Sequence, residues 1–201
     1  MNKIVLVGGG GHARSCIDVI EMENKFSIAG IVDKDSHCKN FIYPFIGTDE
    51  DLPIIRKNYK FSLISLGQIK TPKIRKNLYK KLKDLEFQLP TIFSPNSYVS
   101  KYAKVSEGTI AMHGVVININ ASIGSNCILN NKCLIEHDAE VGNHCHISTG
   151  AVINGRAKVG KGSFIGSGSV INQDVRIGKN CVIGSGVVIK SNIDDGEIVK
   201  K

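Results

Sequence analysis

The sequence predicts two folds in series: a small Rossmann-like α/β domain, then a β-solenoid built from hexapeptide repeats. Segments typical of strands and helices alternate over roughly the first 88 residues, which favours a parallel sheet. From Val99 to Ile189 every sixth residue is aliphatic, and this period fits neither a helix nor an ordinary strand. Three hexads form one triangular coil, so the repeat makes about five coils. We expect domains at 1–88 and 89–201.

The N-terminal domain follows a strand–helix pattern up to its junction with the solenoid. The last expected helix starts after Thr71, a predicted N-cap, with Pro72 in its first turn. The segment Phe87–Pro95 bridges into the repeats. The expected strands are Lys3–Val7, Ile28–Val32 and Phe61–Leu66, and the expected helices are His12–Met22, Leu52–Lys57 and Lys73–Leu85.

Composition limits the possible partners. The net charge of +8 favours anionic ligands. Much of it lies in Lys70–Lys83, which we interpret as the solvated face of a helix. Nucleic-acid binding is the alternative, but this stretch holds one aromatic residue and no recognised nucleic-acid module surrounds it. No apolar run approaches the length of a membrane span, so we expect a cytoplasmic protein without membrane insertion.

The cysteines are expected to serve packing. Cys127, Cys133, Cys145 and Cys181 occupy the small inward position two residues before an aliphatic one. Cys16 lies in a predicted helix, and we place Cys38 in a loop. Because no pair has the spacing of metal ligands, neither a disulfide framework nor a zinc site is expected.

A glycine-rich loop follows the first strand. Gly8, Gly10 and Ala13 match the pattern G-x-G-x-x-A, and Asp33 ends the next strand. Such a loop lets backbone N–H groups approach a phosphate at a helix N-terminus. Because the domain is only half the size of a dinucleotide-binding domain, we favour a nucleotide or nucleotide-sugar diphosphate over NAD. A tight turn without a ligand is the alternative, and His12 either donates to a phosphate or caps the turn.

One corner of the solenoid breaks the repeat pattern. The residue after each aliphatic is usually Gly or Asn, which tolerate left-handed backbone conformations. At one corner the chain instead has Glu136-His137-Asp138. We expect His137 to project outward with its ring oriented by Asp138 or Glu136, which is the arrangement of a general base. The alternative is a solvated corner histidine.

The other histidines offer competing sites. His113 lies at a comparable corner with no acid beside it in the sequence, and we expect His144 and His146 to face outward. Several histidines on a solenoid could bind zinc, as in the gamma-class carbonic anhydrases, but no pair has the five-residue spacing of those enzymes. We expect no metal.

Together these residues resemble a family of bacterial sugar acetyltransferases. The combination of a G-x-G-x-x-type loop domain with an uninterrupted hexapeptide solenoid carrying I-E-H-D is similar to the bacillosamine-pathway N-acetyltransferases and the sialic acid O-acetyltransferase relatives. The resemblance covers nearly the whole chain. It implies a left-handed parallel β-helix, a homotrimer, acetyl-CoA as donor, an active site between adjacent subunits and a nucleotide held by the N-terminal domain.

The resemblance also assigns residues. The catalytic histidine falls on His137 and its acidic partner on Asp138. The chain lacks the family's closing G-x-P-A-K segment, which bears on the outer contacts of acetyl-CoA. The positions implied for acetyl-CoA are Asn130, His146, Gly155, Gly166, Ser167 and Gly184, and those for the nucleotide sugar are Gly8, Gly10, His12, Asp33 and Gly67.

The expected reaction is direct acetyl transfer to the amine of a nucleotide-linked sugar, in the synthesis of a bacterial surface or glycoprotein glycan. His137 takes the proton from the amine as it attacks the thioester, and Asp138 or Glu136 fixes the histidine tautomer. Backbone N–H groups at a glycine corner polarise the carbonyl oxygen. Two alternatives stay open: O-acetylation of a sugar hydroxyl, and a non-catalytic trimeric protein that binds a nucleotide sugar.

Overall fold

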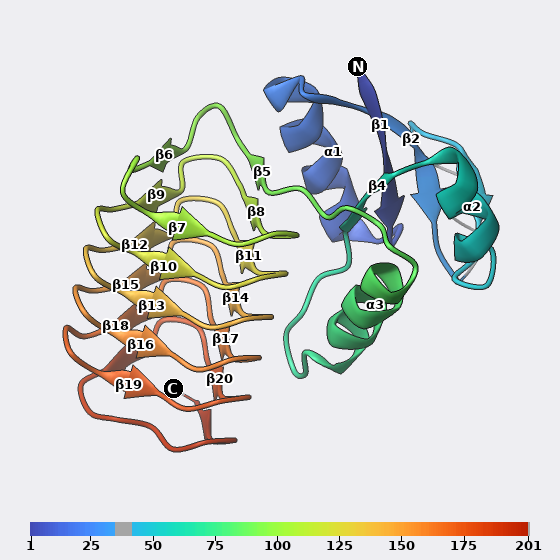
Figure 1. Cartoon of the computed structure of the whole chain (residues 1–201). Helices are drawn as coiled ribbons and strands as arrows, with labels where there is room; N and C mark the ends of the chain where they lie inside the picture. The colour runs from blue at the N-terminus through green and yellow to red at the C-terminus, as the bar shows by residue number, and fades with distance from the viewer. Residues whose placement is uncertain (35–41, 201) are drawn as a thin grey trace.

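The computed structural model describes residues 1–34 and 42–200, so the loop position expected for Cys38 lies outside the described residues. It shows an α/β unit packed against one side of a triangular column of strands (Figure 1). The four-stranded sheet of the α/β unit is parallel, with the order β3-β2-β1-β4. Its elements are β1 (Asn2–Val7), α1 (Gly11–Glu23), β2 (Phe26–Val32), β3 (Phe45–Gly47), α2 (Leu52–Asn58), β4 (Phe61–Ile64) and α3 (Lys73–Asp84).

The α/β unit differs from the sequence expectation in three details. Strand β3 was not predicted, because three residues are too few to show a period. Strand β4 ends at Ile64, and the following residues reach the column, where Gln68 hydrogen-bonds to His144 and His146. The N-cap of α3 is Pro72 and not Thr71, although the Thr71 hydroxyl accepts a hydrogen bond from the Lys73 amide at 3.2 Å. None of the helices in the described part of the chain is long and apolar enough to cross a membrane.

The column is a left-handed parallel β-helix with three faces, as predicted. Strands eighteen residues apart pair in register, for example Ile128 with His146. We name the faces by what covers them. The domain face packs on the α/β unit and contains β5 (Ile92–Phe93), β8 (Ile110–Ala111), β11 (Ile128–Leu129), β14 (His146–Ile147), β17 (Phe164–Ile165), β20 (Val182–Ile183) and β22 (Ile198–Val199).

The two other faces differ in the residues they turn outward. The apolar face contains β6 (Tyr98–Val99), β9 (Val116–Ile117), β12 (Leu134–Ile135), β15 (Val152–Ile153), β18 (Val170–Ile171) and β21 (Val188–Ile189). The charged face contains β7 (Lys104–Val105), β10 (Ser122–Ile123), β13 (Glu140–Val141), β16 (Lys158–Val159) and β19 (Arg176–Ile177). The first residue of each strand points outward and the second fills the core.

We number the three corners in chain order. The first corner joins the domain face to the apolar face, the second joins the apolar face to the charged face, and the third leads back to the domain face. The residues of left-handed backbone conformation lie third after the core aliphatic, for example Asn120 at φ +59° and Asp138 at φ +59°. The expectation that they lie first after it was therefore wrong.

The glycines directly after the aliphatic positions are needed for space and not for a left-handed backbone. A Cβ on Gly160 would lie 2.5 Å from the carbonyl carbon of Gly178, and one on Gly166 would lie 2.5 Å from that of Gly184. These positions are glycine because adjacent coils approach each other too closely for a side chain.

The third corner contains a column of buried hydroxyls and thiols. Each donates to a backbone carbonyl in the third corner of the next coil, as in Thr109 to Gly124 at 2.8 Å and Cys127 to Gly142 at 3.1 Å. Cys145, Ser163 and Cys181 continue the series. The small inward position therefore supplies hydrogen bonds as well as space.

Arg75 of α3 joins the two units and is completely buried. Its guanidinium donates to the carbonyls of Ile64 and Leu66 in the α/β unit, and to the carbonyl and side-chain oxygens of Asn126 in the third corner. Burial lowers the pKa of Arg75 to about 10, so it remains cationic at neutral pH.

We propose residues 1–88 and 89–201 as the two domains. Gln88 still pairs with β4, since the Ser62 amide donates to its carbonyl at 3.0 Å. Strand β5 begins at Ile92 and already pairs with the next coil.

Replacing Arg75 by methionine is expected to lower the free energy of unfolding by about 3–5 kcal/mol, because it leaves buried carbonyl oxygens without a donor. Arg176→Met, at an exposed position on the charged face, is the control and should change stability by less than about 0.5 kcal/mol. Urea denaturation measures both. Equal losses in the two variants would show that Arg75 does not hold the units together.

Candidate active site

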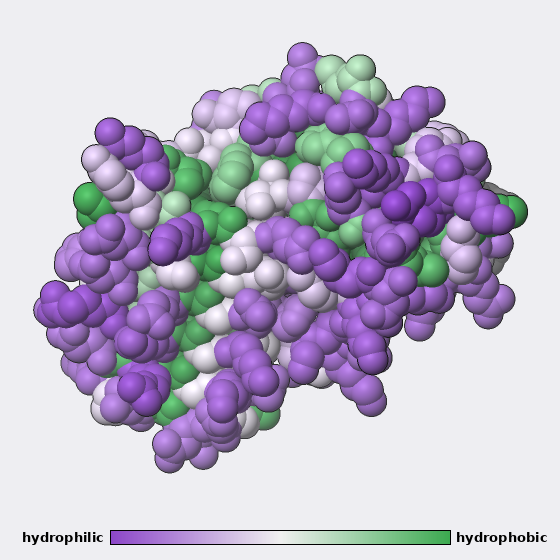
Figure 2. All heavy atoms as spheres, viewed as in Figure 1, coloured by the Kyte–Doolittle hydropathy of each residue, from purple (hydrophilic) through white to green (hydrophobic). Residues whose placement is uncertain are grey.

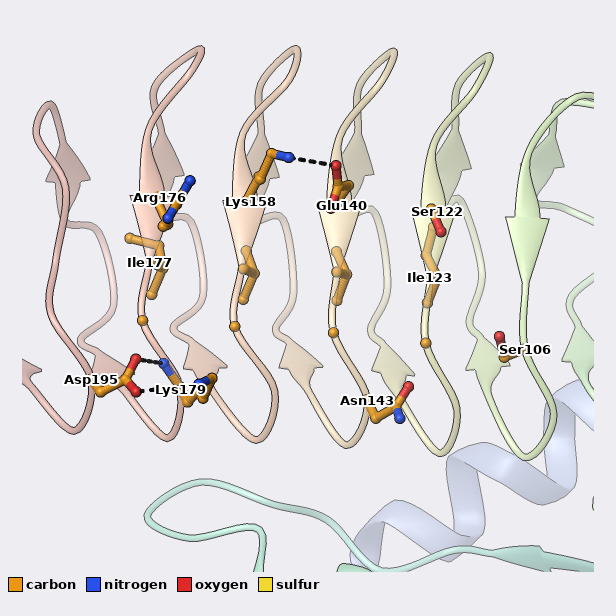
Figure 3. Close-up of a pocket in the computed structure, with 16 residues that line it drawn as sticks. Ser106, Ser122, Ile123, Glu140, Asn143, Lys158, Arg176, Ile177, Lys179 and Asp195 are labelled. Atoms are coloured by element: carbon orange, nitrogen blue, oxygen red, sulfur yellow. Dashed lines mark hydrogen bonds and ion pairs between the residues drawn. The ribbon is translucent and has the colours of Figure 1, made fainter.

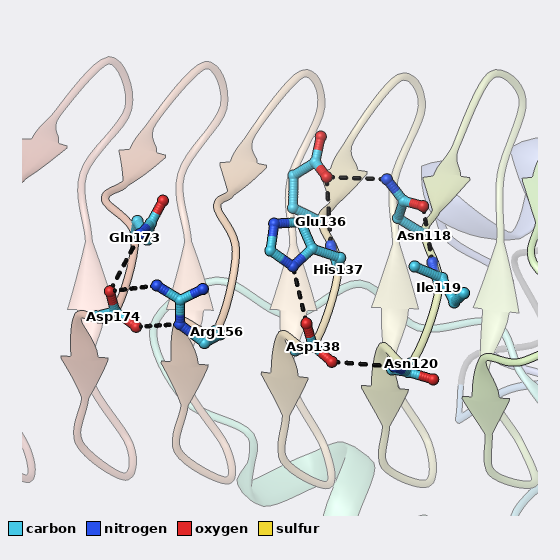
Figure 4. Close-up of polar contacts among 9 residues, drawn as sticks. All are labelled: Asn118, Ile119, Asn120, Glu136, His137, Asp138, Arg156, Gln173 and Asp174. Atoms are coloured by element: carbon cyan, nitrogen blue, oxygen red, sulfur yellow. Dashed lines mark hydrogen bonds and ion pairs between the residues drawn. The ribbon is translucent and has the colours of Figure 1, made fainter.

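His137 stands at the second corner, in the turn after β12, where its side chain is 44% exposed. Its Nδ1 lies 2.8 Å from Asp138 Oδ2 (Figure 4). Because a carboxylate only accepts hydrogen bonds, Nδ1 carries a proton, and in the neutral form of the ring Nε2 presents a lone pair. The geometry is that of a general base.

The two neighbouring acids have different tasks. Hydrogen bonds from His137 and then Asn120 hold the pKa of Asp138 below its usual range, so this carboxylate stays charged beside the ring. Glu136 instead accepts hydrogen bonds from the Asn118 side chain at 2.9 Å and from the backbone N–H of His137 at 3.3 Å (Figure 4). Asp138 therefore orients the ring, whereas Glu136 fixes the turn.

Gly155, the equivalent residue one coil later, lies against the His137 ring. A Cβ at this position would stand 2.7 Å from Nε2. The imidazole of His137 therefore packs directly against the backbone of Gly155. A glycine is needed here for space, and no left-handed backbone is involved.

A second set of predicted residues lines a pocket of about 450 Å³ between the α/β unit and the column. His12 and Gly67 come from the α/β unit, whereas Asn130 and His146 come from the first corner and from β14. The other lining residues are Gly11, Ser15, Gln68 and Ile69.

His146 faces outward from the column, as predicted, but the α/β unit covers it, so it is buried in this pocket and not exposed. Its ring packs edge-on against Phe164, and its Nδ1 donates to the Gln68 carbonyl at 2.5 Å. Burial lowers the pKa of His146 to about 4, with a smaller contribution from the Arg75 cation, while the hydrogen bond to Gln68 acts the other way. His146 is therefore neutral at pH 7, and its Nε2 lone pair faces the Asn130 amide at 3.4 Å.

Two buried polar atoms of this pocket have no hydrogen-bond partner among the described residues: His12 Nε2 and Gln68 Oε1. Burial, the Arg75 cation and His146 together lower the pKa of His12 to about 3. Unpaired buried polar atoms are uncommon, and both belong to side chains of residues that line the pocket.

The glycine loop between β1 and α1 is the other part of the α/β unit that contains predicted site residues. Gly8 is at φ +114°, and a Cβ there would meet Leu66 at 2.5 Å. Asp33 accepts a hydrogen bond from the Gly9 amide. Gly10 is the N-cap of α1 and makes no side-chain cap, so the start of the helix is open to an anion. Beside the loop is a cavity of about 140 Å³ lined by Val7, Gly8, Asp33, Lys34, Asp49, Leu66, Ile74 and Leu78.

The remaining predicted positions lie at the first corner, away from His137. Gly166 and Gly184 stack directly on each other, and the Ser167 hydroxyl lies 2.9 Å from that of Ser148. On one chain the predicted site is thus divided: His137 and Gly155 lie at the second corner, and the other acetyl-CoA positions lie at or beside the first.

Two further histidines have partners that the sequence did not show. His144 faces outward from the column, as predicted, but it is half-buried beneath α3, edge-on to Tyr79, and burial with the neighbouring cations lowers its pKa to about 4. His113 has an acid beside it after all, since its Nε2 lies 2.8 Å from Asp18 of α1. Sequence reasoning missed this pair because 95 residues separate its members.

A shallow groove of about 560 Å³ runs along the charged face (Figure 3). It follows the aliphatic residues of β10, β13, β16 and β19 and the glycine after each of them, which are visible as a green and white stripe in Figure 2. The Lys158–Glu140 ion pair, at 2.7 Å, borders the groove. The groove contains none of the predicted site residues. Within residues 1–34 and 42–200, no group of three or more His, Cys, Asp or Glu side chains is placed to hold a metal ion.

Comparisons with known families match both parts of the chain. Residues 3–82 match the PglD N-terminal domain, and residues 120–155 and 156–191 match the bacterial transferase hexapeptide repeats. A comparison with curated protein sequences finds no match.

Solved structures resemble the whole chain. The acetyltransferase domain of PglB from Neisseria gonorrhoeae FA1090, in complex with acetyl coenzyme A, is 25% identical over 99% of this chain and 96% of that chain, with a TM-score of 0.92. A mutant of perosamine N-acetyltransferase from Caulobacter crescentus, in complex with CoA and GDP-perosamine, is 28% identical over 98% and 93%, with a TM-score of 0.91. WeeI from Acinetobacter baumannii AYE, at 18% identity over 100% and 97% and a TM-score of 0.76, shares the fold.

Replacing Gly155 by alanine is expected to turn the His137 ring away from Asp138, because the new methyl group overlaps Nε2. A crystal structure of the variant and the ring ¹⁵N signals of His137 would show the broken Nδ1–carboxylate contact. The control is Gly196→Asn in the last turn, at φ +81° with open space around it, a conformation that Asn tolerates. An unmoved ring in Gly155→Ala would contradict this account of the glycine.

Proposed function

We propose that this chain is a hexapeptide-repeat sugar acetyltransferase with a PglD N-terminal domain, and that it transfers the acetyl group of acetyl-CoA to the amine of a nucleotide-linked sugar. The observation that carries the proposal is the exposed His137 ring, held by Asp138 with Nε2 free. Two of the similar solved structures support it, since one is an acetyltransferase domain bound to acetyl-CoA and the other an N-acetyltransferase bound to CoA and GDP-perosamine.

His137 acts as the general base for direct transfer. As the amine nitrogen attacks the thioester carbonyl, Nε2 takes its proton and the new C–N bond forms. The C–S bond then breaks, and the imidazolium returns the proton to the departing thiolate. Asp138 stabilises the imidazolium meanwhile and keeps Nδ1 protonated. No covalent bond to the protein is required.

The acceptor occupies the α/β side of the site. The open start of α1 at Gly10 takes the diphosphate, and Gly8 and Asp33 border the cavity for the nucleoside. The sugar then lies in the pocket lined by His12, Gly67, Asn130 and His146, whose imidazole and amide groups suit its hydroxyl and amine groups. For acetyl-CoA we propose the two corners that carry Gly155, Gly166, Ser167 and Gly184.

A homotrimer brings the two corners together. The outward residues of the apolar face form a ladder of side chains that water would otherwise contact; Tyr98 is 60% and Val188 52% exposed at its ends. The equivalent ladder on the charged face is polar throughout. Packing the apolar face against a neighbouring copy buries this ladder and can place His137 opposite the neighbour's first corner. The ladder is Tyr98, Val116, Leu134, Val152, Val170 and Val188.

O-acetylation by the same base is the second candidate. It is favoured less, because a sugar hydroxyl is a far weaker nucleophile than an amine and His137 is not a strong base. Since the donor is an intracellular metabolite, we also propose a cytoplasmic location and a role in building the sugars of a bacterial glycan.

The first test offers matched sugar nucleotides with an amino group or a hydroxyl at the same carbon, together with acetyl-CoA. Mass spectrometry is expected to show faster acetylation of the amine at saturating donor. Faster acetylation of the hydroxyl compound would establish the O-acetyltransferase alternative. Binding of both compounds with transfer to neither would indicate a non-catalytic binding protein.

The second test separates the two halves of the site. His137→Ala should lower the transfer rate by roughly 10²–10⁴-fold in a folded protein. Gly10→Tyr should block the nucleotide loop without disturbing the fold, because a Cβ there meets nothing within 4 Å. Co-expressed in one cell, the two inactive variants should regain about a quarter of the wild-type rate, since mixed trimers combine an intact His137 with an intact loop. A mixture as inactive as its components would place the whole site on one subunit.

A further inference from the structure

Asp18 and His113 lie outside the pocket but link its two sides. His113, in the first corner after β8, contacts Asp18 of α1 through Nε2 at 2.8 Å and the Ser94 hydroxyl through Nδ1 at 2.7 Å. Asp18 only accepts, so Nε2 carries a proton. Nδ1 can accept from the Ser94 hydroxyl when the ring is neutral and donate to it when the ring is charged, so the contact survives either state.

From His113 the hydrogen bonds continue into the pocket. The His113 backbone N–H donates to the Asn131 side chain at 3.1 Å, and the Asn131 backbone N–H donates to Asn130 Oδ1 at 2.8 Å. The Asn130 amide faces His146 Nε2, and His146 Nδ1 donates to the Gln68 carbonyl. The series begins on α1 and ends at Gln68, so the α/β unit holds both of its ends.

The position of Asp18 on α1 allows its contact with His113 to set the orientation of the helix. Asp18 lies two helical turns beyond Gly11, about 10 Å along the axis. The start of the same helix forms the proposed diphosphate site. Any tilt of α1 at Asp18 therefore changes the span between that site and the residues Asn130 and His146.

We propose that Asp18 and His113 are positioning residues, which fix α1 against the column so that a sugar held at the glycine loop reaches Asn130 and His146 in register. This inference rests on the proposed function. Because Asp18 acts only through the orientation of the helix, its loss should impair transfer and leave nucleotide binding intact.

The test compares Asp18→Ala, Asp18→Asn and, as the matched control, Asp84→Ala at an exposed carboxylate near the end of α3. Asp18→Ala is expected to lower kcat about tenfold, with the calorimetric Kd for the nucleotide sugar within about twofold of wild type. Asp18→Asn should recover most of the loss, because its amide oxygen still accepts from His113 Nε2. Asp84→Ala should match wild type.

A second readout does not depend on catalysis. The ring ¹⁵N signals of His146, assigned with His146→Gln, should show one Nδ1–H tautomer in the wild type and a mixture in Asp18→Ala. An unchanged kcat in Asp18→Ala overturns the proposal, as does a loss of kcat that follows the melting temperature with the tautomer unchanged. If the wild type transfers no acetyl group to an amine, the proposed function fails, and the ¹⁵N signals still decide whether Asp18 positions His146.

Discussion

The buried guanidinium of Arg75 is the interaction on which the arrangement of this molecule depends. It donates to carbonyls on both sides of the junction and pairs with no carboxylate among the described residues. A buried cation of this kind is stable only where several oxygen atoms surround it. The same charge helps to keep His12 and His146 neutral, so one side chain sets both the geometry of the pocket and the protonation state of its histidines.

The second constraint is the close spacing of the coils. Glycines stand where adjacent turns nearly touch, and the exceptional corner at Glu136-His137-Asp138 is compatible with this spacing only because Gly155 follows it one coil later. Asp138 is the third residue after the core aliphatic Ile135, a position that requires a left-handed backbone. Few residue types tolerate this conformation, and Asp is one of them. The proposed base and its acid therefore occupy positions that the fold leaves available.

The repeat and the strand–helix alternation were predictable because they are local patterns, and these two signals determine both halves of the fold. The exposed His137 beside Asp138 was likewise predictable, since adjacent residues at a corner must share it. Contacts between distant segments were not. Neither the burial of His146 under Gln68 nor the pairing of His113 with Asp18 leaves any periodic signal, because both depend on how α1 and the segment after β4 pack on the column. The corner glycines were assigned correctly in position but to the wrong cause, since sequence shows composition and not the distance to the next coil.

The eighteen-residue register has a consequence for how such a chain can change during evolution. Within the column each coil hydrogen-bonds to the coils on either side of it, as in the series of hydroxyls and thiols at the third corner. Duplicating or deleting one whole coil would keep the inward positions and corners of all other coils in phase, and would change the height of the column. An insertion of a single residue would instead rotate all later side chains out of place. The length of such a column therefore changes in steps of one coil of eighteen residues, which duplication of a gene segment can supply while Glu136-His137-Asp138 keeps its place at the second corner.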